Sequence, residues 1–315
     1  MSKPPVLVTK RVPSAALARL EAACEIDVND GSESLTHQEL VARVRGKRGL
    51  LSIVTDTIDR EVLEASPDLK VVATVAVGYN NIDLAAARAL GITVTNTPDV
   101  LTDATADLTW ALILSAMRRI VEGDRLVRRG GWTGSPLDFM LGADVRGKQL
   151  GIVGFGRIGR AVAARAPAFG MRVAYMSRSP HAVDGAEAMS LDRLLATSDV
   201  VSLHCPLTAD TRHLINQAAL ARMKRTAYLI NASRGPVVDE AALAWALKNR
   251  MLAGAALDVY EQEPTVHPDL LTLENVVLSP HIGSATAETR LAMADLAAQN
   301  IVAVLSGQPP LTPIR

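Results

Sequence analysis

The chain has 315 residues, 49% of them hydrophobic, and its 33 basic residues equal its 33 acidic residues in number. This length predicts two domains, and the zero net charge argues against nucleic acid or an anionic membrane as the main partner. The apolar stretch "LTWALILSAM" falls well short of the ~20 residues that a membrane span needs, and the N-terminus lacks the apolar core of a secretory signal.

Three β-branched runs in the first third each precede a helical pattern. "VLVTK" precedes residues 14–24, "GLLSIV" precedes 59–66, and "KVVATVAVG" precedes 83–90, which Gly91 closes. Thr36 and Glu39 have the spacing of a capping box ahead of "LVARV". Strands that alternate with helices predict βαβ units and a parallel sheet.

This alternation is interrupted after Pro98. Residues 100–129 have the pattern of one long helix, and the next stretch, up to Lys148, is irregular. Six apolar runs then follow: "QLGIVGFG", "MRVAYMS", "DVVSLHC", "TAYLINAS", "LAGAALDV" and "NVVLSPH". With helices between most of them, in which Asn216 and Asp239 are candidate N-caps, they predict a second, doubly wound sheet.

A final helical pattern over residues 286–305 belongs to no βα unit of the second sheet. We therefore expect it to return to the first domain, which would comprise residues 1–99 and 284–315, while residues 100–283 form the second. The cysteines, Cys24 and Cys205, lie far apart without metal or redox spacing, so we expect both to be small buried side chains. These features predict a cytoplasmic protein that binds no metal, nucleic acid or membrane.

A glycine motif follows the first strand of the second sheet. Gly154, Gly156 and Gly159 have the GxGxxG spacing, between an apolar strand and a helix. The first glycine permits a tight turn, the second lets a pyrophosphate approach the backbone, and the third lets the helix pack on the strand. The complete strand–turn–helix–strand context predicts a dinucleotide site.

The second strand of this unit ends in Ser177 and Arg178, where an NAD enzyme places an acidic residue on the adenosine ribose. A carboxylate there would repel a 2′-phosphate, whereas a serine hydroxyl can donate to it and an arginine can pair with it. A charge-assisted hydrogen bond contributes ~1.5–3 kcal/mol. The sequence therefore predicts a preference for NADPH over NADH.

Three later strand ends carry reactive side chains. Arg234 follows "TAYLI", Glu261 and Glu263 follow "AGAAL", and His281 follows "VVL". The carboxyl ends of parallel strands face the ligand crevice, so these groups would converge near a nicotinamide. An arginine, a carboxylate and a histidine suit carbonyl reduction, with the histidine as proton donor. Spacing does not decide which of the two glutamates acts.

Several motifs resemble the D-isomer-specific 2-hydroxyacid dehydrogenase family along essentially the whole chain. They are "TVAVGYNNIDL", "GFGRIGRAVAARAPAFGM", "NASRGPVVDE", "AGAALDVYEQEP" and "SPHIGSAT". Within the family, the endings like "HPDLLTLENVVLSPHIGSAT" and the serine–arginine pair are similar to NADPH-dependent glyoxylate and hydroxypyruvate reductases. The resemblance implies two Rossmann-like or flavodoxin-like parallel-sheet domains with the active site in the cleft between them.

The resemblance also implies roles for individual residues. Arg234 would bind the substrate carboxylate and carbonyl, His281 would donate the proton, and Glu263 would be the carboxylate partner. The substrate carboxylate would bind the backbone N–H groups of Val77 and Gly78, with Leu51 beside them. The implied cofactor contacts are the three glycines with Arg157, Ile158, Ser177, Arg178, Ser179, Cys205, Pro206, Ala232, Ser233, Asp258 and Gly283.

Membership of this family further implies a homodimer built from a helix and arm at about residues 100–147. In related reductases a tryptophan from the partner's arm closes the active site, and this sequence has Phe139 at the matching place. Two alternatives stay open. One is a dehydrogenase for bulkier 2-keto acids, and the other is a non-enzymatic, nucleotide-sensing protein like the corepressors with this fold.

Overall fold

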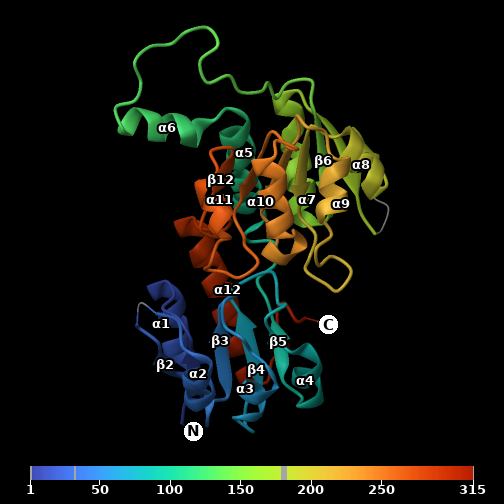
Figure 1. The fold of residues 1–315 in the computed structure, drawn as a ribbon. Helices are drawn as coiled ribbons and strands as arrows, with labels where there is room; N and C mark the ends of the chain where they lie inside the picture. Colours follow the sequence, from blue (N-terminus) through green and yellow to red (C-terminus); the bar gives the residue numbers. More distant parts are fainter. Residues whose placement is uncertain (1, 32, 179–182, 315) are drawn as a thin grey trace. The chain divides into compact units, whose positions relative to one another are not determined.

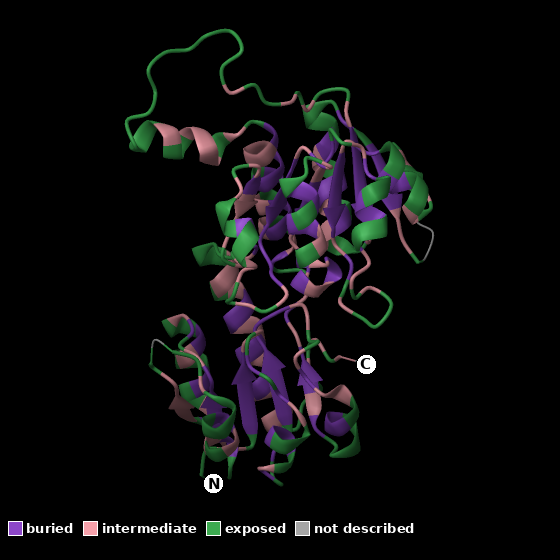
Figure 2. Ribbon diagram, viewed as in Figure 1, coloured by how far each residue is buried: buried purple, intermediate pink, exposed green. Residues whose placement is uncertain are grey.

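The computed structural model describes residues 2–31, 33–178 and 183–314 (Figure 1). The chain forms two compact units. One comprises the residues up to 101 together with those from 284 onward, and the other comprises residues 102–283. In both units most of the strands are buried and the surrounding helices are partly exposed (Figure 2).

The first unit contains a five-stranded parallel sheet in the order β2-β1-β3-β4-β5. Its strands are β1 (Pro5–Val8), β2 (Glu25–Val28), β3 (Gly49–Ser52), β4 (Val71–Thr74) and β5 (Thr93–Thr95). This order is the flavodoxin-like one. The sequence did not indicate β2 and β5, because one is an edge strand with no fully buried residue and the other has only three residues.

The helices of the first unit are α1 (Ser14–Ala23), α2 (His37–Val44), α3 (Arg60–Glu64), α4 (Leu84–Ala89) and α12 (Ala287–Leu305). Thr36 and Glu39 form the expected capping box at the start of α2. Gly91, just beyond the C-cap of α4, has a φ of 70°. The long α12 packs against α1 and against β3 and β4, so a segment far along the chain completes the core of this unit.

The second unit contains a seven-stranded parallel sheet in the order β12-β11-β10-β9-β6-β7-β8. Its strands are β6 (Gln149–Val153), β7 (Arg172–Met176), β8 (Ala186–Ala188), β9 (Val200–Leu203), β10 (Tyr228–Asn231), β11 (Gly254–Leu257) and β12 (Val276–Leu278). The order reverses between β6 and β9, and doubly wound sheets bind ligands at the carboxyl ends of the strands beside that switch point. The expected fold class, two parallel α/β sheets, is confirmed, although the short, partly exposed edge strand β8 was not predicted.

The helices of the second unit are α5 (Thr102–Met117), α6 (Ile120–Arg128), α7 (Arg157–Arg165), α8 (Leu191–Thr197), α9 (Gln217–Arg222), α10 (Glu240–Lys248) and α11 (Pro268–Thr272). Short 3₁₀ turns span Ala166–Phe169 and Gly235–Val237. One layer consists of α5 packed on α7, and α8, α9 and α10 form the other. Asn216 and Asp239 cap α9 and α10 as expected, each accepting a backbone N–H with its side chain.

The prediction of one helix over residues 100–129 is wrong. The chain breaks between α5 and α6 at Arg119, which has a left-handed conformation with φ 53°. The guanidinium of Arg119 donates to both carboxylate oxygens of Glu122, at 2.6 and 2.8 Å, and to the carbonyl of Leu141 at 3.3 Å. These contacts stabilise the break between the two helices. Because no glycine or proline stands at the break, helix propensity did not indicate that the helix ends there.

Candidate active site

The glycine loop lies at the carboxyl end of β6, next to the switch point. Gly154 has a φ of 94°, and a Cβ there would lie 2.5 Å from the backbone nitrogen of Cys205. A Cβ on Gly159 would lie 2.3 Å from the carbonyl oxygen of Gly154. Gly156 caps α7 and has nothing within 4 Å of its Cβ position. Two glycines are therefore required by close packing, and the second leaves open space before the N-terminus of α7, which suits a pyrophosphate.

The remaining residues expected at the cofactor follow the strands around this loop. Arg157 and Ile158 open α7, and Ser177 and Arg178 follow directly on β7. Ser177 is half-buried and Arg178 is exposed, while Ser179 lies outside the described residues. The other members of the set follow β9, β10, β11 and β12: Cys205, Pro206, Ala232, Ser233, Asp258 and Gly283.

Both cysteines are free and buried, as the sequence predicted. Burial raises the pKa of the Cys205 thiol to about 11, so this side chain stays neutral beside the glycine loop.

Asp258 anchors the loop that carries His281. One of its carboxylate oxygens accepts from the hydroxyl of Ser279 at 2.6 Å and from the N–H of Ile282 at 2.8 Å. The other oxygen accepts from the N–H of Gly283 at 2.8 Å. Burial raises the pKa of Asp258, and these hydrogen bonds oppose that effect. The three hydrogen bonds involve residues on both sides of His281 in the sequence. The φ of His281, 52°, is uncommon for a residue other than glycine and requires such support.

His281 and Glu263 form a hydrogen-bonded pair. The Nδ1 atom of His281 lies 2.6 Å from Oε2 of Glu263, and the other oxygen of Glu263 accepts the N–H of Tyr260 at 3.0 Å. Burial tends to raise the pKa of Glu263, but the hydrogen bond and charge of His281 outweigh it and lower that pKa below its ordinary value. Because Nδ1 is occupied, only Nε2 of His281 remains for another partner.

The lowered pKa of Glu263 predicts how stability changes in acid. The ionised carboxylate stabilises the folded chain above the unfolded-state pKa of about 4.3, and this contribution is lost as the pH falls through the lower folded-state pKa. Glu263→Gln removes the contribution at every pH. We therefore expect the wild type to have the higher urea midpoint near neutral pH, by a margin that shrinks below about pH 4. An equal margin at both pH values would contradict the role of ionised Glu263.

Arg234 follows β10 at the same edge of the sheet. Its Nη1 donates to the carbonyl of Ser233 at 2.7 Å. Burial lowers the pKa of Arg234, and the charge of Glu263 acts in the opposite direction. Arg234 and the His281–Glu263 pair therefore stand at the ends of three neighbouring strands, β10, β11 and β12, as the sequence predicted for these strand ends.

Glu261, the other glutamate of this loop, has different partners. Its Oε1 lies 2.5 Å from Nε2 of His213, and its Oε2 accepts the N–H of Glu240 at 3.3 Å. The structure therefore pairs His281 with Glu263. The spacing of the residues left this choice open, whereas the family resemblance implied Glu263. Neither gave a sign of Glu240 and His213, since one resembles an ordinary acidic residue in a first helical turn and the other a loop histidine.

In the first unit, the residues expected at the substrate lie at the carboxyl ends of β3 and β4. Leu51 is in β3 with a fully buried side chain, and its carbonyl accepts the N–H of Thr9 at 3.0 Å. Val77 and Gly78 follow β4 and are half-buried, and the carbonyl of Val77 accepts from the side chain of Asn96 at 2.8 Å.

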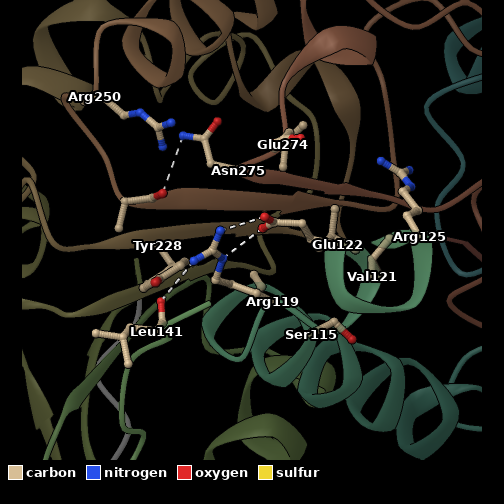
Figure 3. A pocket seen from close by; sticks show the side chains of 14 residues that line it. Ser115, Arg119, Val121, Glu122, Arg125, Leu141, Tyr228, Arg250, Glu274 and Asn275 are labelled. Carbon is tan, nitrogen blue, oxygen red and sulfur yellow. Dashed lines mark hydrogen bonds and ion pairs between the residues drawn. The ribbon is translucent and has the colours of Figure 1, made fainter. Parts of the chain in front are cut away.

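A cavity of about 360 Å³ lies at the opposite edge of the second sheet (Figure 3). It is bordered by the α5–α6 break and by the amino ends of β10 and β12, with Arg119, Tyr228 and Val276 among its lining residues. It is therefore remote from the strand ends that carry Arg234 and His281. In the described ranges, no cluster of three or more His, Cys, Asp or Glu is arranged to hold a metal ion. Within the same ranges, we find no helix with the length and apolar character to cross a membrane.

The chain matches known proteins along nearly its whole length. It is 48% identical over 319 residues to a glyoxylate reductase of Thermococcus onnurineus, covering 98% of this chain and 95% of that one. A crystal structure of a protein from Thermus thermophilus matches with a TM-score of 0.94 and 48% identity, covering 99% and 100% of the two chains. An NADPH-dependent glyoxylate/hydroxypyruvate reductase of Sinorhizobium meliloti, solved with NADP and malonate, matches with a TM-score of 0.89 and 36% identity, covering 99% and 97%.

Residues 110–283 match the family described as D-isomer specific 2-hydroxyacid dehydrogenase, NAD binding domain. This match spans more than half of the chain and contains the glycine loop, Arg234 and the His281–Glu263 pair. The chain therefore belongs to the D-isomer specific 2-hydroxyacid dehydrogenases, a family of oxidoreductases.

Proposed function

We propose that this protein reduces small 2-keto acids, glyoxylate and hydroxypyruvate, to the corresponding 2-hydroxy acids with NADPH. The observation that carries this proposal is the His281–Glu263 pair, held at 2.6 Å at the sheet edge where Arg234 also lies. The names of the relatives support the substrate class. When bound, the nicotinamide supplies a hydride to the carbonyl carbon, and the carbonyl oxygen then requires a proton.

His281 donates that proton from Nε2. The carboxylate of Glu263 accepts from Nδ1, fixes the orientation of the ring and stabilises its protonated form before transfer. The loop around His281 is held by the bonds of Asp258 to Ile282 and Gly283, so the ring does not have to be ordered again in each cycle.

Arg234 binds the carboxylate and the carbonyl oxygen of the substrate. Its planar guanidinium presents donors in a fork that fits two oxygens at once. The backbone N–H groups of Val77 and Gly78, with Leu51 beside them, are the substrate contacts that we propose for the first unit. A panel of 2-keto acids, followed by nicotinamide absorbance with NADPH and with NADH, tests the substrate class. Turnover confined to bulky 2-keto acids, or no turnover at all, would overturn the proposal.

We infer the preference for NADPH from Ser177 and Arg178, which follow β7 where a carboxylate would select NADH. Ser177 donates to the 2′-phosphate, Arg178 pairs with it, and the exposed position of Arg178 leaves its guanidinium accessible to such a ligand. Ser179 would be a further contact. The relative from Sinorhizobium meliloti, named as NADPH-dependent, agrees with this inference.

Replacing Ser177 by Asp together with Arg178→Ala should reverse the cofactor preference. The new carboxylate accepts from the ribose hydroxyls and repels the 2′-phosphate, and the second change removes the cationic partner. Loss of one charge-assisted bond, ~1.5–3 kcal/mol, corresponds to a change of at least about tenfold in the ratio of kcat/KM for the two cofactors. The change should appear mainly in KM, because these contacts are nearly uniform through the reaction.

Arg172→Ala provides the matched control for this switch. Arg172 is an exposed arginine on the same strand, β7, but at its amino end. Its removal takes away the same charge and should leave the preference unchanged. A wild type that already prefers NADH, or an equal effect of both variants, would show that Arg178 is an ordinary surface charge.

We also infer that the protein is a cytoplasmic homodimer, built on residues 100–147. Large apolar side chains are exposed on α6 and the following arm: Ile120 and Val127 at 57%, Trp132 at 57% and Leu137 at 101% of full exposure. Such a run of apolar surface is typical of an interface with another chain. Light scattering should give twice the monomer mass of 33.5 kDa, and a single monomer mass would refute the dimer.

A further inference from the structure

Two acidic residues that the proposed reaction does not use lie in or beside the loop that carries Glu263. Glu240 is the first residue of α10 and is only 5% exposed. Glu261 belongs to the loop itself, two residues before Glu263, and its side chain is 23% exposed. A buried carboxylate is costly unless hydrogen bonds compensate its lost hydration, so its contacts indicate what it does.

The carboxylate of Glu240 holds both ends of this loop. One oxygen accepts the N–H of Glu261, and the other accepts the N–H of His267 at 3.3 Å. In return, the N–H of Glu240 donates to the carboxylate of Glu261 at 3.3 Å. Residues 261–267, which lead into α11, are thereby fixed to the start of α10 (Figure 1).

The same loop is fitted against the segment that carries Arg234. A Cβ on Gly235 would lie 1.8 Å from the carbonyl carbon of Tyr260, so the two backbones are in direct contact there. His213 ties the two segments together, because its ring contacts Glu261 at 2.5 Å and its N–H donates to the carbonyl of Pro236 at 2.8 Å.

We propose that Glu240 and Glu261 are positioning residues, which place the loop so that Glu263 meets His281 and the Tyr260–Glu261 peptide supports the segment of Arg234. Neither residue touches the substrate. Glu240 needs both carboxylate oxygens, because it receives two backbone N–H groups, and an amide in its place offers one acceptor and one donor. The inference rests on the proposed function, since it concerns how that site is held.

The test compares Glu240→Gln with Asp199→Asn. Asp199 is a matched control because its carboxylate also accepts a backbone N–H, from Gln149 at 2.9 Å, but at the amino edge of the same sheet. A displaced catalytic group can cost up to about 100-fold, so we expect Glu240→Gln to lower kcat about 10- to 100-fold with little change in the KM for NADPH. Asp199→Asn should lower the melting temperature and leave kcat unchanged.

A second measurement separates positioning from general destabilisation. The Nδ1 proton of His281, assigned by its loss in His281→Ala, should shift in the NMR spectrum of Glu240→Gln and stay in place in Asp199→Asn. Wild-type kcat and an unshifted resonance in folded Glu240→Gln would overturn the inference. So would equal losses of kcat in both variants.

If Glu240→Gln does not fold, the same measurements of kcat and of the His281 resonance are made on Glu261→Gln. The side chain of Glu261 is more exposed than that of Glu240, so this variant is the alternative test. Absence of 2-keto acid turnover in the wild type would instead reject the proposed function, and the resonance of His281 in the positioning variants would still report on the loop. The two failures are therefore distinguishable.

Discussion

His281→Ala is expected to lower kcat about 10²–10⁴-fold, the usual contribution of general acid catalysis. The imidazole has Nδ1 bound to Glu263 at 2.6 Å, so Nε2 is its proton-donating atom, and alanine supplies none. Binding of NADPH should be retained, because the glycine loop lies at the end of β6 and does not depend on this side chain. Steady-state kinetics with glyoxylate, together with fluorescence titration of NADPH, measures both quantities.

His37→Ala is the control for this prediction. His37 also pairs with a carboxylate, Asp59, at 2.9 Å, but it is exposed and lies in the first unit at the start of α2. Its removal should leave kcat unchanged. If His281→Ala is folded, binds NADPH and turns over at nearly the wild-type rate, His281 is not the proton donor.

Arg234→Lys is expected to lower kcat/KM by about 10- to 100-fold, the equivalent of one or more charge-assisted bonds of ~1.5–3 kcal/mol. Lysine keeps the positive charge but loses the planar fork that holds the substrate carboxylate and carbonyl together. The half-buried guanidinium also interacts with the charge of Glu263, and the ammonium of lysine offers fewer donors than the guanidinium, so hydrogen bonds are left unmade. Affinity for NADPH should change little.

Arg165→Lys tests whether any such replacement in this unit is harmful. Arg165 also pairs with carboxylates, those of Asp103 and Asp107, but on the surface where α7 meets α5. It should keep full kcat/KM, because surface ion pairs contribute little. A collapse of NADPH affinity in Arg234→Lys would show instead that Arg234 binds a phosphate.

Much of the candidate site could be read from local sequence. Close contacts require glycine at positions 154 and 159, and Gly154 also has a positive φ that other residues rarely adopt. With Gly156, which leaves open space before α7, they form a recognisable spacing after an apolar strand. Arg234 and His281 directly follow such strands, and the carboxyl ends of parallel strands lie at one edge of the sheet. Their proximity in the fold therefore followed from the strand pattern alone.

Other features depend on contacts between distant parts of the chain. The edge strand β8 has few apolar residues to mark it, and it exists because β7 pairs with it. The break between α5 and α6 depends on bonds from Arg119 to the nearby Glu122 and to the remote Leu141. The contact with Leu141 is not encoded in any local pattern.

The sequence by itself determined the two parallel sheets, the glycine loop and the strand ends that carry Arg234 and His281, because strand periodicity and glycine geometry are local properties. The spacing of the residues did not separate the two glutamates; the family resemblance implied Glu263 as the partner of His281, and the tertiary structure shows the physical reason. Glu261 and Glu263 are equivalent in type and nearly so in position, but Glu261 is held by Glu240 and His213, which leaves Glu263 directed to the imidazole. That choice depends on groups about 20 to 50 residues away, which meet only when α10 packs beside the loop.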